Sequence, residues 1–155
     1  MKFYISYFYQ IRFFTPNMIP VSTAMWDPKW YRRKVPNLNK NGVLIGCRAP
    51  ILNFPSNLWE ELTKHNQECR KDCPFSTPCL FMKKYKEYLN TINFDEFIES
   101  FQEFYNKTNM ENLVFVLIVH EAPWRKCAER PVLQEWFKEH GIELEEWDKN
   151  LDKEE

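Results

Sequence analysis

The residues best suited to chemistry follow a long hydrophobic segment in the second half of the chain. Cys127 lies at the expected start of a helix, with Arg125, Lys126 and Arg130 close to it in sequence. Free backbone N–H groups at a helix N-terminus and nearby cations favour the thiolate, which is the reactive form of cysteine. In the first helical turn, Arg130 would suit a phosphate or another oxyanion. Glu121 follows the hydrophobic segment and could act as a general base.

A structural role for the same residues is the alternative. Cys127 would then be a small buried side chain, and Glu121 and Arg130 would form an ion pair that only stabilises the fold. The spacing is not that of the Cys-x5-Arg loop of tyrosine phosphatases. The position nevertheless favours chemistry, because ligands of open α/β sheets bind beyond the carboxyl ends of the strands. Cys127, Arg130 and Glu121 are therefore the candidate catalytic residues.

Five further side chains are candidates for binding a substrate at the same edge of the sheet. If the first two strands flank the central one, aromatic rings there could stack on a base and hydroxyl groups could donate hydrogen bonds to it. Packing of the aromatic residues at a sheet edge is the alternative. The candidates are Ser6, Tyr7, Ser22, Trp26 and Trp30.

A cysteine cluster forms a separate constellation, in the segment CRKDCPFSTPC. Cys69, Cys73 and Cys79 would converge at a corner between two helices, with Cys47 or His65 as a fourth ligand. Three or four thiolates suit Zn²⁺ or an iron–sulfur cluster. The Cys-x3-Cys-x5-Cys spacing matches no common zinc motif, so cysteines without a metal in a capping loop are the alternative.

The elements that must position these residues are read from hydrophobic periodicity. Leu113–Val119 is continuously apolar, which indicates an interior strand of a parallel sheet, buried on both faces. Further strands are expected at 3–9, at 18–24, at 43–47 (whose place in the sheet stays open) and, as an edge strand, at 142–147. Helices are expected at about 57–68, 79–92, 93–105 and 128–140. The sequence thus predicts a single three-layer α/β domain over residues 1–147. Its central sheet would be mostly parallel with helices on both faces, with a cysteine-rich helix–loop–helix insertion at about 57–92 and an acidic, frayed tail at 148–155.

Composition limits the partners. The chain has 155 residues, with 21 basic against 22 acidic side chains, so net charge gives no argument for nucleic acid. Residues 29–48 carry six basic side chains and no acidic one, which indicates either a solvated surface or a contact with a polyanion. The longest apolar run is far shorter than a membrane span, so no membrane partner is expected. Five cysteines without an export signal favour reduced thiols and a cytoplasmic location.

Several short motifs together resemble the domain-of-unknown-function 488 family. The resemblance implies a compact α/β fold and no established reaction. Two positions differ from the family pattern: Ala128 and Glu129 separate Cys127 from Arg130, where a histidine usually stands, and His120 replaces a common aromatic residue. The motifs are Ser6-Tyr7-Phe8, Val21-Ser22-Thr23-Ala24, Pro28-Lys29-Trp30-Tyr31, Ala49-Pro50, the central strand with Glu121, Cys127, Arg130, and Glu135-Trp136-Phe137.

Two hypotheses about function follow from these patterns. The first is a small enzyme that acts on a nucleotide, a nucleic acid or another anionic substrate through Cys127, Arg130 and Glu121. The second is a non-catalytic binding module, stabilised by a metal at residues 69–79, that contacts a polyanion through its basic stretch 29–48. Loss of activity in Cys127→Ser would favour the first, and salt-sensitive binding that survives this substitution would favour the second.

Overall fold

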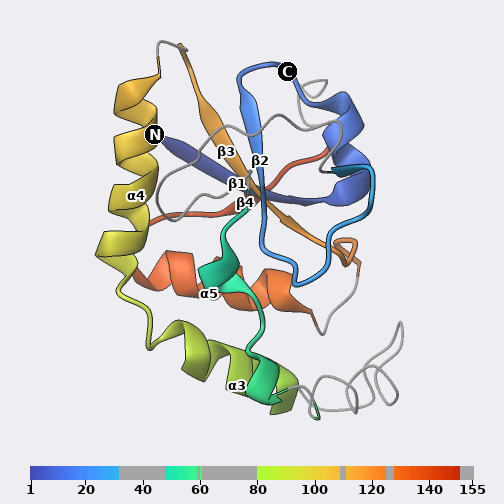
Figure 1. Ribbon diagram of the computed structural model, residues 1–155, viewed down its shortest axis with the longest axis vertical. Helices are drawn as coiled ribbons and strands as arrows, with labels where there is room; N and C mark the ends of the chain where they lie inside the picture. The colour runs from blue at the N-terminus through green and yellow to red at the C-terminus, as the bar shows by residue number, and fades with distance from the viewer. Residues whose placement is uncertain (32–47, 59, 61–79, 109–110, 125–127, 151–155) are drawn as a thin grey trace.

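Four parallel strands form the centre of the molecule. The computed structural model describes residues 1–31, 48–58, 60, 80–108, 111–124 and 128–150. The strands are β1 (Lys2–Tyr7), β2 (Met18–Ser22), β3 (Val114–Val119) and β4 (Glu145–Glu146). Their order in the sheet is β2-β3-β1-β4, and every pairing is parallel. The predicted α/β fold with a parallel sheet is confirmed (Figure 1).

The central strand is the apolar segment that the sequence singles out. β3 pairs with β1 from Lys2–Val114 to Tyr7–Val119, and with β2 on its other side. Its residues from Phe115 to Val119 are buried, and they alternate between two separate apolar clusters. A strand covered on both faces needs no polar side chain along its length, which explains the unbroken apolar run. The prediction of an interior strand parallel to the first strand is confirmed.

Two α-helices, α4 (Phe94–Lys107) and α5 (Glu129–Glu139), pack on one face of the sheet, and α3 (Leu80–Leu89) packs against α5 (Figure 1). The apolar stripe of α4 packs on the strands through Phe101, whose ring lies 4.8 Å from that of Phe115 and 5.1 Å from that of Phe3. Asn93 caps α4 by accepting a hydrogen bond from the backbone N–H of Glu96. The aromatic side chains on one side of α3 and of α4 belong to the core.

The other face is covered by a 3-10 helix, η1 (Phe8–Phe13), and by the segment around Tyr31. Figure 1 shows α4 and the blue turns of η1 on opposite sides of the strands. Phe8 packs edge-on against Tyr31 at 5.5 Å, over the β3 side chains Val116 and Ile118. Helical elements thus lie on both faces, which gives the three expected layers.

Several element boundaries differ from the predicted ones. The first strand ends at Tyr7, two residues early, because the aromatic run continues as η1 instead of staying extended. The second strand ends at Ser22, and the C-terminal strand has only two residues, Glu145 and Glu146. Two short 3-10 helices, η2 (Pro50–Leu52) and η3 (Ser56–Leu58), lie before the gap at 61–79.

Part of the predicted organisation falls outside the described residues. This applies to the strand at 43–47, to nearly all of the helix expected at 57–68, and to the cysteine-rich connection that follows. Arg48, the first described residue after 32–47, bridges to Ser22 in a parallel orientation. At the other end, the backbone N–H of Lys149 donates to the side chain of Gln10, which ties the start of the acidic tail to η1. Within the described residues, no helix is both long and apolar enough to cross a membrane.

Candidate functional site

The candidate site lies where β1, β3 and β4 end and α5 begins. The catalytic candidate Cys127 lies outside the described residues, as do the metal-ligand candidates Cys47, Cys69, Cys73 and Cys79 and the alternative ligand His65. Among the described residues, no group of three or more histidine, cysteine or acidic side chains is arranged to hold a metal ion. The geometry of the site therefore rests on Arg130 and its neighbours.

Arg130 is buried in the first turn of α5, with 4% of its surface exposed. Its Nε lies 2.5 Å from a carboxylate oxygen of Glu146 on β4. Its guanidinium also lies 5.9 Å from the ring centre of Tyr7, at the end of β1. Neither terminal nitrogen has a hydrogen-bond partner among the described residues. A buried cation with unsatisfied donors is costly, and such a group in a native protein calls for an explanation.

Glu121 follows β3 and contributes to the electrostatic environment of Arg130. It forms no ion pair with Arg130 in the described structure, whose carboxylate partner is Glu146 instead. One oxygen of Glu121 is buried and has no hydrogen-bond partner among the described residues. Burial lowers the pKa of Arg130, while the charges of Glu146 and Glu121 raise it. An arginine remains protonated under these conditions, so the site holds a fixed positive charge.

Two carboxyl groups beside Arg130 hold their protons more strongly than usual. Burial raises the pKa of Glu146 to about 7, against the opposing effect of Arg130. Burial, with the charge of Glu121 added, raises the pKa of Glu129 well above its ordinary value. Carboxyl groups with raised pKa values can donate protons near neutral pH, and they occur often at functional sites. Partial protonation also makes the surroundings of Arg130 less negative than their formal charges indicate.

The N-terminus of α5 matches the predicted position. Ala128 is the N-cap, so Cys127 comes one residue before the cap and not at it. Alanine offers no side-chain acceptor, so the N-cap residue makes no side-chain hydrogen bond to the first-turn N–H groups. Pro131 is the third helical residue, where a missing N–H does no harm. First-turn N–H groups, which have no partner within their own helix, and a buried guanidinium thus lie in the same helical turn.

Of the predicted substrate-binding residues, Tyr7 lies beside Arg130. It is half-buried, and its ring contacts that of Trp124 edge-on at 6.3 Å. Ser6 is buried, and its hydroxyl group donates to the backbone carbonyl of Trp147 at 2.8 Å. The serine therefore fixes the last strand to the first, and its hydroxyl group is already used in the fold.

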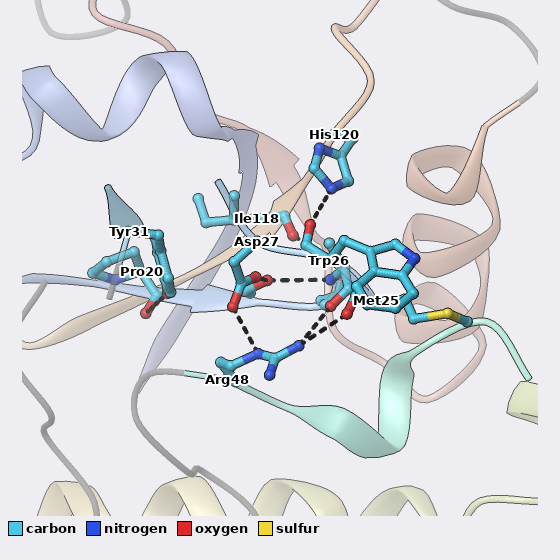
Figure 2. A network of polar contacts seen from close by, with 11 residues as sticks. Pro20, Met25, Trp26, Asp27, Tyr31, Arg48, Ile118 and His120 are labelled. Atoms are coloured by element: carbon cyan, nitrogen blue, oxygen red, sulfur yellow. Dashed lines mark hydrogen bonds and ion pairs between the residues drawn. The ribbon is translucent and has the colours of Figure 1, made fainter. Parts of the chain in front are cut away.

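A second polar network joins Ser22, Asp27 and Arg48 at the end of β2. Figure 2 shows Asp27 and Arg48 together with His120, which contacts the backbone carbonyl of Trp26. The hydroxyl group of Ser22 donates to Asp27 at 2.5 Å, and the other carboxylate oxygen of Asp27 lies 2.8 Å from Nε of Arg48. A terminal nitrogen of Arg48 donates to the carbonyls of Ala24 and Met25. These contacts hold the 24–27 loop in place, and the Ser22 hydroxyl group belongs to that framework.

The two predicted tryptophans differ in position. Trp26 is 68% exposed, and its backbone carbonyl lies 2.5 Å from Nε2 of His120 (Figure 2). Its indole contacts no other ring in the described structure. Trp30 is packed on the second face of the sheet, against Phe8 and Tyr31. The five predicted binding residues are therefore spread over two networks and a core cluster, and Tyr7 is the member that contacts Arg130.

Sequence reasoning missed Glu146 as the partner of Arg130 and Asp27 as the partner of Arg48. The signal for Glu146 is the break in the alternation of apolar and acidic residues after Ile142, which puts Glu146 on the same strand face as Leu144. Asp27 precedes Pro28, and a turn closes there, from the N–H of Tyr31 to the carbonyl of Pro28. Its buried carboxylate, however, serves Arg48.

Comparisons with protein-family models, with curated proteins and with solved structures gave no match to this chain. The resemblance to the domain-of-unknown-function 488 family therefore stays a prediction.

Proposed function

We propose that the protein acts on an anionic substrate at the carboxyl edge of its sheet. Arg130 holds a phosphate or carboxylate group of the substrate, Cys127 is the nucleophile, and Glu121 is the general base. The observation that carries the proposal is the guanidinium of Arg130, which is buried but lacks partners for its two terminal nitrogens in the described structure.

A half-buried arginine, Arg48, gives the comparison that makes this observation meaningful. Arg48 and Arg130 lie at the same edge of the sheet, and each pairs through Nε with a largely buried carboxylate, Asp27 or Glu146. Arg48 then uses a terminal nitrogen on two backbone carbonyls, as a purely structural arginine should. Arg130 is more deeply buried, and neither of its terminal nitrogens has a hydrogen-bond partner in the described structure. Its planar pair of donors matches the two oxygens of a phosphate or carboxylate.

The unsatisfied oxygen of Glu121 adds a complementary feature. A ligand that satisfies Arg130 offers acceptor oxygens, and one that also satisfies Glu121 offers a proton donor. A monoprotonated phosphate or a phosphate monoester next to a hydroxyl group carries both. The free N–H groups at the start of α5 favour the same charge, because the helix dipole is positive there.

The test is calorimetric titration of the reduced protein with inorganic phosphate and pyrophosphate in chloride buffer. Arg130→Lys keeps the charge but loses the paired donors, and we expect it to weaken binding by about 10- to 100-fold, as for two charge-assisted hydrogen bonds. Arg48→Lys is the matched control, since it disturbs an equivalent ion pair whose arginine is already satisfied. Circular dichroism checks that both variants fold.

Equal loss of binding in the two variants would contradict the proposal, as would a folded wild-type protein that binds neither anion. Cys127→Ser separates binding from chemistry. We expect this variant to bind phosphate normally and to lose any turnover that the wild-type protein shows on phosphorylated substrates.

A further inference from the structure

A row of aromatic rings leads away from Arg130 over the surface. It consists of Trp124, Tyr7, Tyr9 and Phe13, and is called the aromatic row below. Successive ring centres lie 6.3, 6.4 and 5.8 Å apart. Trp124 is 67% exposed, Tyr9 47% and Phe13 37%. Single exposed aromatic residues are common on proteins, but four in continuous contact form an apolar patch that calls for a ligand.

The local backbone explains why Tyr9 and Arg12 face outward. Side chains three residues apart align along a 3-10 helix. In η1, Phe8 and Ile11 pack against the sheet, so Tyr9 and Arg12 fall together on the outer side. Because the residues after Tyr7 form a 3-10 helix and not a continued strand, some of their aromatic side chains lie at the protein surface.

Positively charged groups lie along the aromatic row. The guanidinium of Arg12 lies 4.2 Å from the ring centre of Tyr9, and the ammonium group of Lys149 lies 4.7 Å from that of Phe13. Arg130 lies farther along the row, with its guanidinium 5.9 Å from the ring centre of Tyr7. Arg12 and Lys149 are exposed, and Arg12 uses only its Nε, on the carbonyl of Tyr9, within the described structure. Rings with interleaved cations are the combination by which proteins bind single-stranded nucleic acids.

We infer that the aromatic row binds a single-stranded stretch of nucleic acid, whose bases stack on the rings and whose phosphates contact Arg12, Lys149 and Arg130. The inference specifies the substrate of the proposed function and rests on it for the contact at Arg130. A duplex does not fit, because its bases stack on one another and hide their faces. DNA and RNA share the chemistry used here, since every base has a face that can stack.

The size of the row decides between a strand and a single nucleotide. One base covers one ring and one phosphate needs one cation, whereas the row offers four rings and a cation beside each of Tyr7, Tyr9 and Phe13. Acidic groups are also near: Glu146 pairs with Arg130, and Asp148 acts electrostatically on Glu146. These two acidic groups interact with Arg130 and not with Arg12, so a phosphate at Arg12 meets less competition from carboxylates.

The experiment measures fluorescence anisotropy of labelled dT15 and U15 against protein concentration at several salt concentrations. We expect Trp124→Ala and Tyr9→Ala each to weaken binding by about 5- to 100-fold, the usual effect of losing one stacked base. Trp26→Ala is the matched control, since Trp26 is equally exposed but lies outside the row. A similar loss in Trp26→Ala would overturn the assignment to the row.

Salt dependence tests the cations. Three phosphate contacts predict that log K falls against log salt with a slope of about −2, and Arg12→Gln should reduce the slope by about 0.7. Lys107→Gln, which removes one charge from the end of α4, is the control for net charge. If Arg12→Gln and Lys107→Gln changed the slope of log K against log salt by the same amount, the inference would be contradicted.

The outcomes separate the two proposals. Phosphate binding that depends on Arg130, with oligonucleotide binding indifferent to the row variants or absent, overturns the inference and leaves the proposed function intact. Oligonucleotide binding that depends on Tyr9 and Trp124, with no phosphate binding at Arg130, overturns the proposed function and keeps the stacking surface. If a free mononucleotide bound as tightly as dT15, the inference that the ligand is a single-stranded stretch of nucleic acid would be contradicted.

Discussion

The proton on Glu146 should make the stability of the protein depend on pH in an unusual direction. Its carboxyl group has a pKa of about 7 in the folded protein, against an ordinary value of 4.5. Between these two values the folded state holds a proton that the unfolded state has released. Stability therefore falls as pH rises through this range, which is the opposite of the behaviour of a typical ion-paired carboxylate. Below pH 4.5 the contribution is fully present, and above pH 7 it is lost.

The magnitude follows from the same two values. Moving a carboxyl pKa from 4.5 to about 7 corresponds to roughly 3 kcal/mol between those pH values. The side chain of Glu146 keeps 22% of its surface exposed, so water screens part of this cost. We expect the unfolding free energy to decrease by about 1 to 2 kcal/mol from pH 4.5 to pH 8 through Glu146 alone.

Urea unfolding followed by tryptophan fluorescence at half-unit pH steps measures this effect. Glu146→Gln keeps an oxygen acceptor for Arg130 and removes the titration, so its profile should be flatter by the same 1 to 2 kcal/mol. The difference between the two profiles matters here, because Glu129 contributes in the same direction in both proteins. Parallel profiles of wild type and Glu146→Gln would refute the assignment.

Three further outcomes are expected. In urea unfolding, Asp27→Asn should lower the unfolding free energy by about 3 kcal/mol, because it leaves Arg48 without a charge partner. Ser22→Ala, which removes one hydrogen bond to Asp27, should lower it by only about 1 kcal/mol. Alkylation of Cys127 should show a pKa below the free-thiol value of about 8.5, and titration at or above it would leave the cysteine a structural role. Protein purified without air should contain either about one equivalent of zinc or the roughly two or four iron atoms of an iron–sulfur cluster, and Cys73→Ser should lose the metal. Metal-free wild-type protein would contradict the predicted cluster.

Much of the fold could be predicted because its signals are local. The apolar run at Leu113–Val119, the cap at Asn93 and the aromatic stripe of α4 each follow from short-range periodicity. The end of β1 could not be predicted. Strand and 3-10 helix both tolerate the aromatic run, and the choice depends on how Phe8 packs against Tyr31, a residue 23 positions away.

The site divides in the same way. The position of Arg130 in a first helical turn follows from Pro131 and from the polar residues after the central strand. The carboxylate partner of Arg130 could not be predicted in this way, because several acidic residues follow Ile142. The register of β4 on β1 decides which of them reaches Arg130. The ion pair of Asp27 with Arg48 likewise depends on a contact between distant segments.

The most direct test of the central claim is a crystal structure with selenate, a phosphate-like anion that anomalous scattering locates. We expect a selenate peak whose oxygens lie about 3 Å from both terminal nitrogens of Arg130, with Nε still on Glu146. A guanidinium whose terminal nitrogens are instead bonded to Glu121 or Glu129, with no selenate beside it, would contradict the claim.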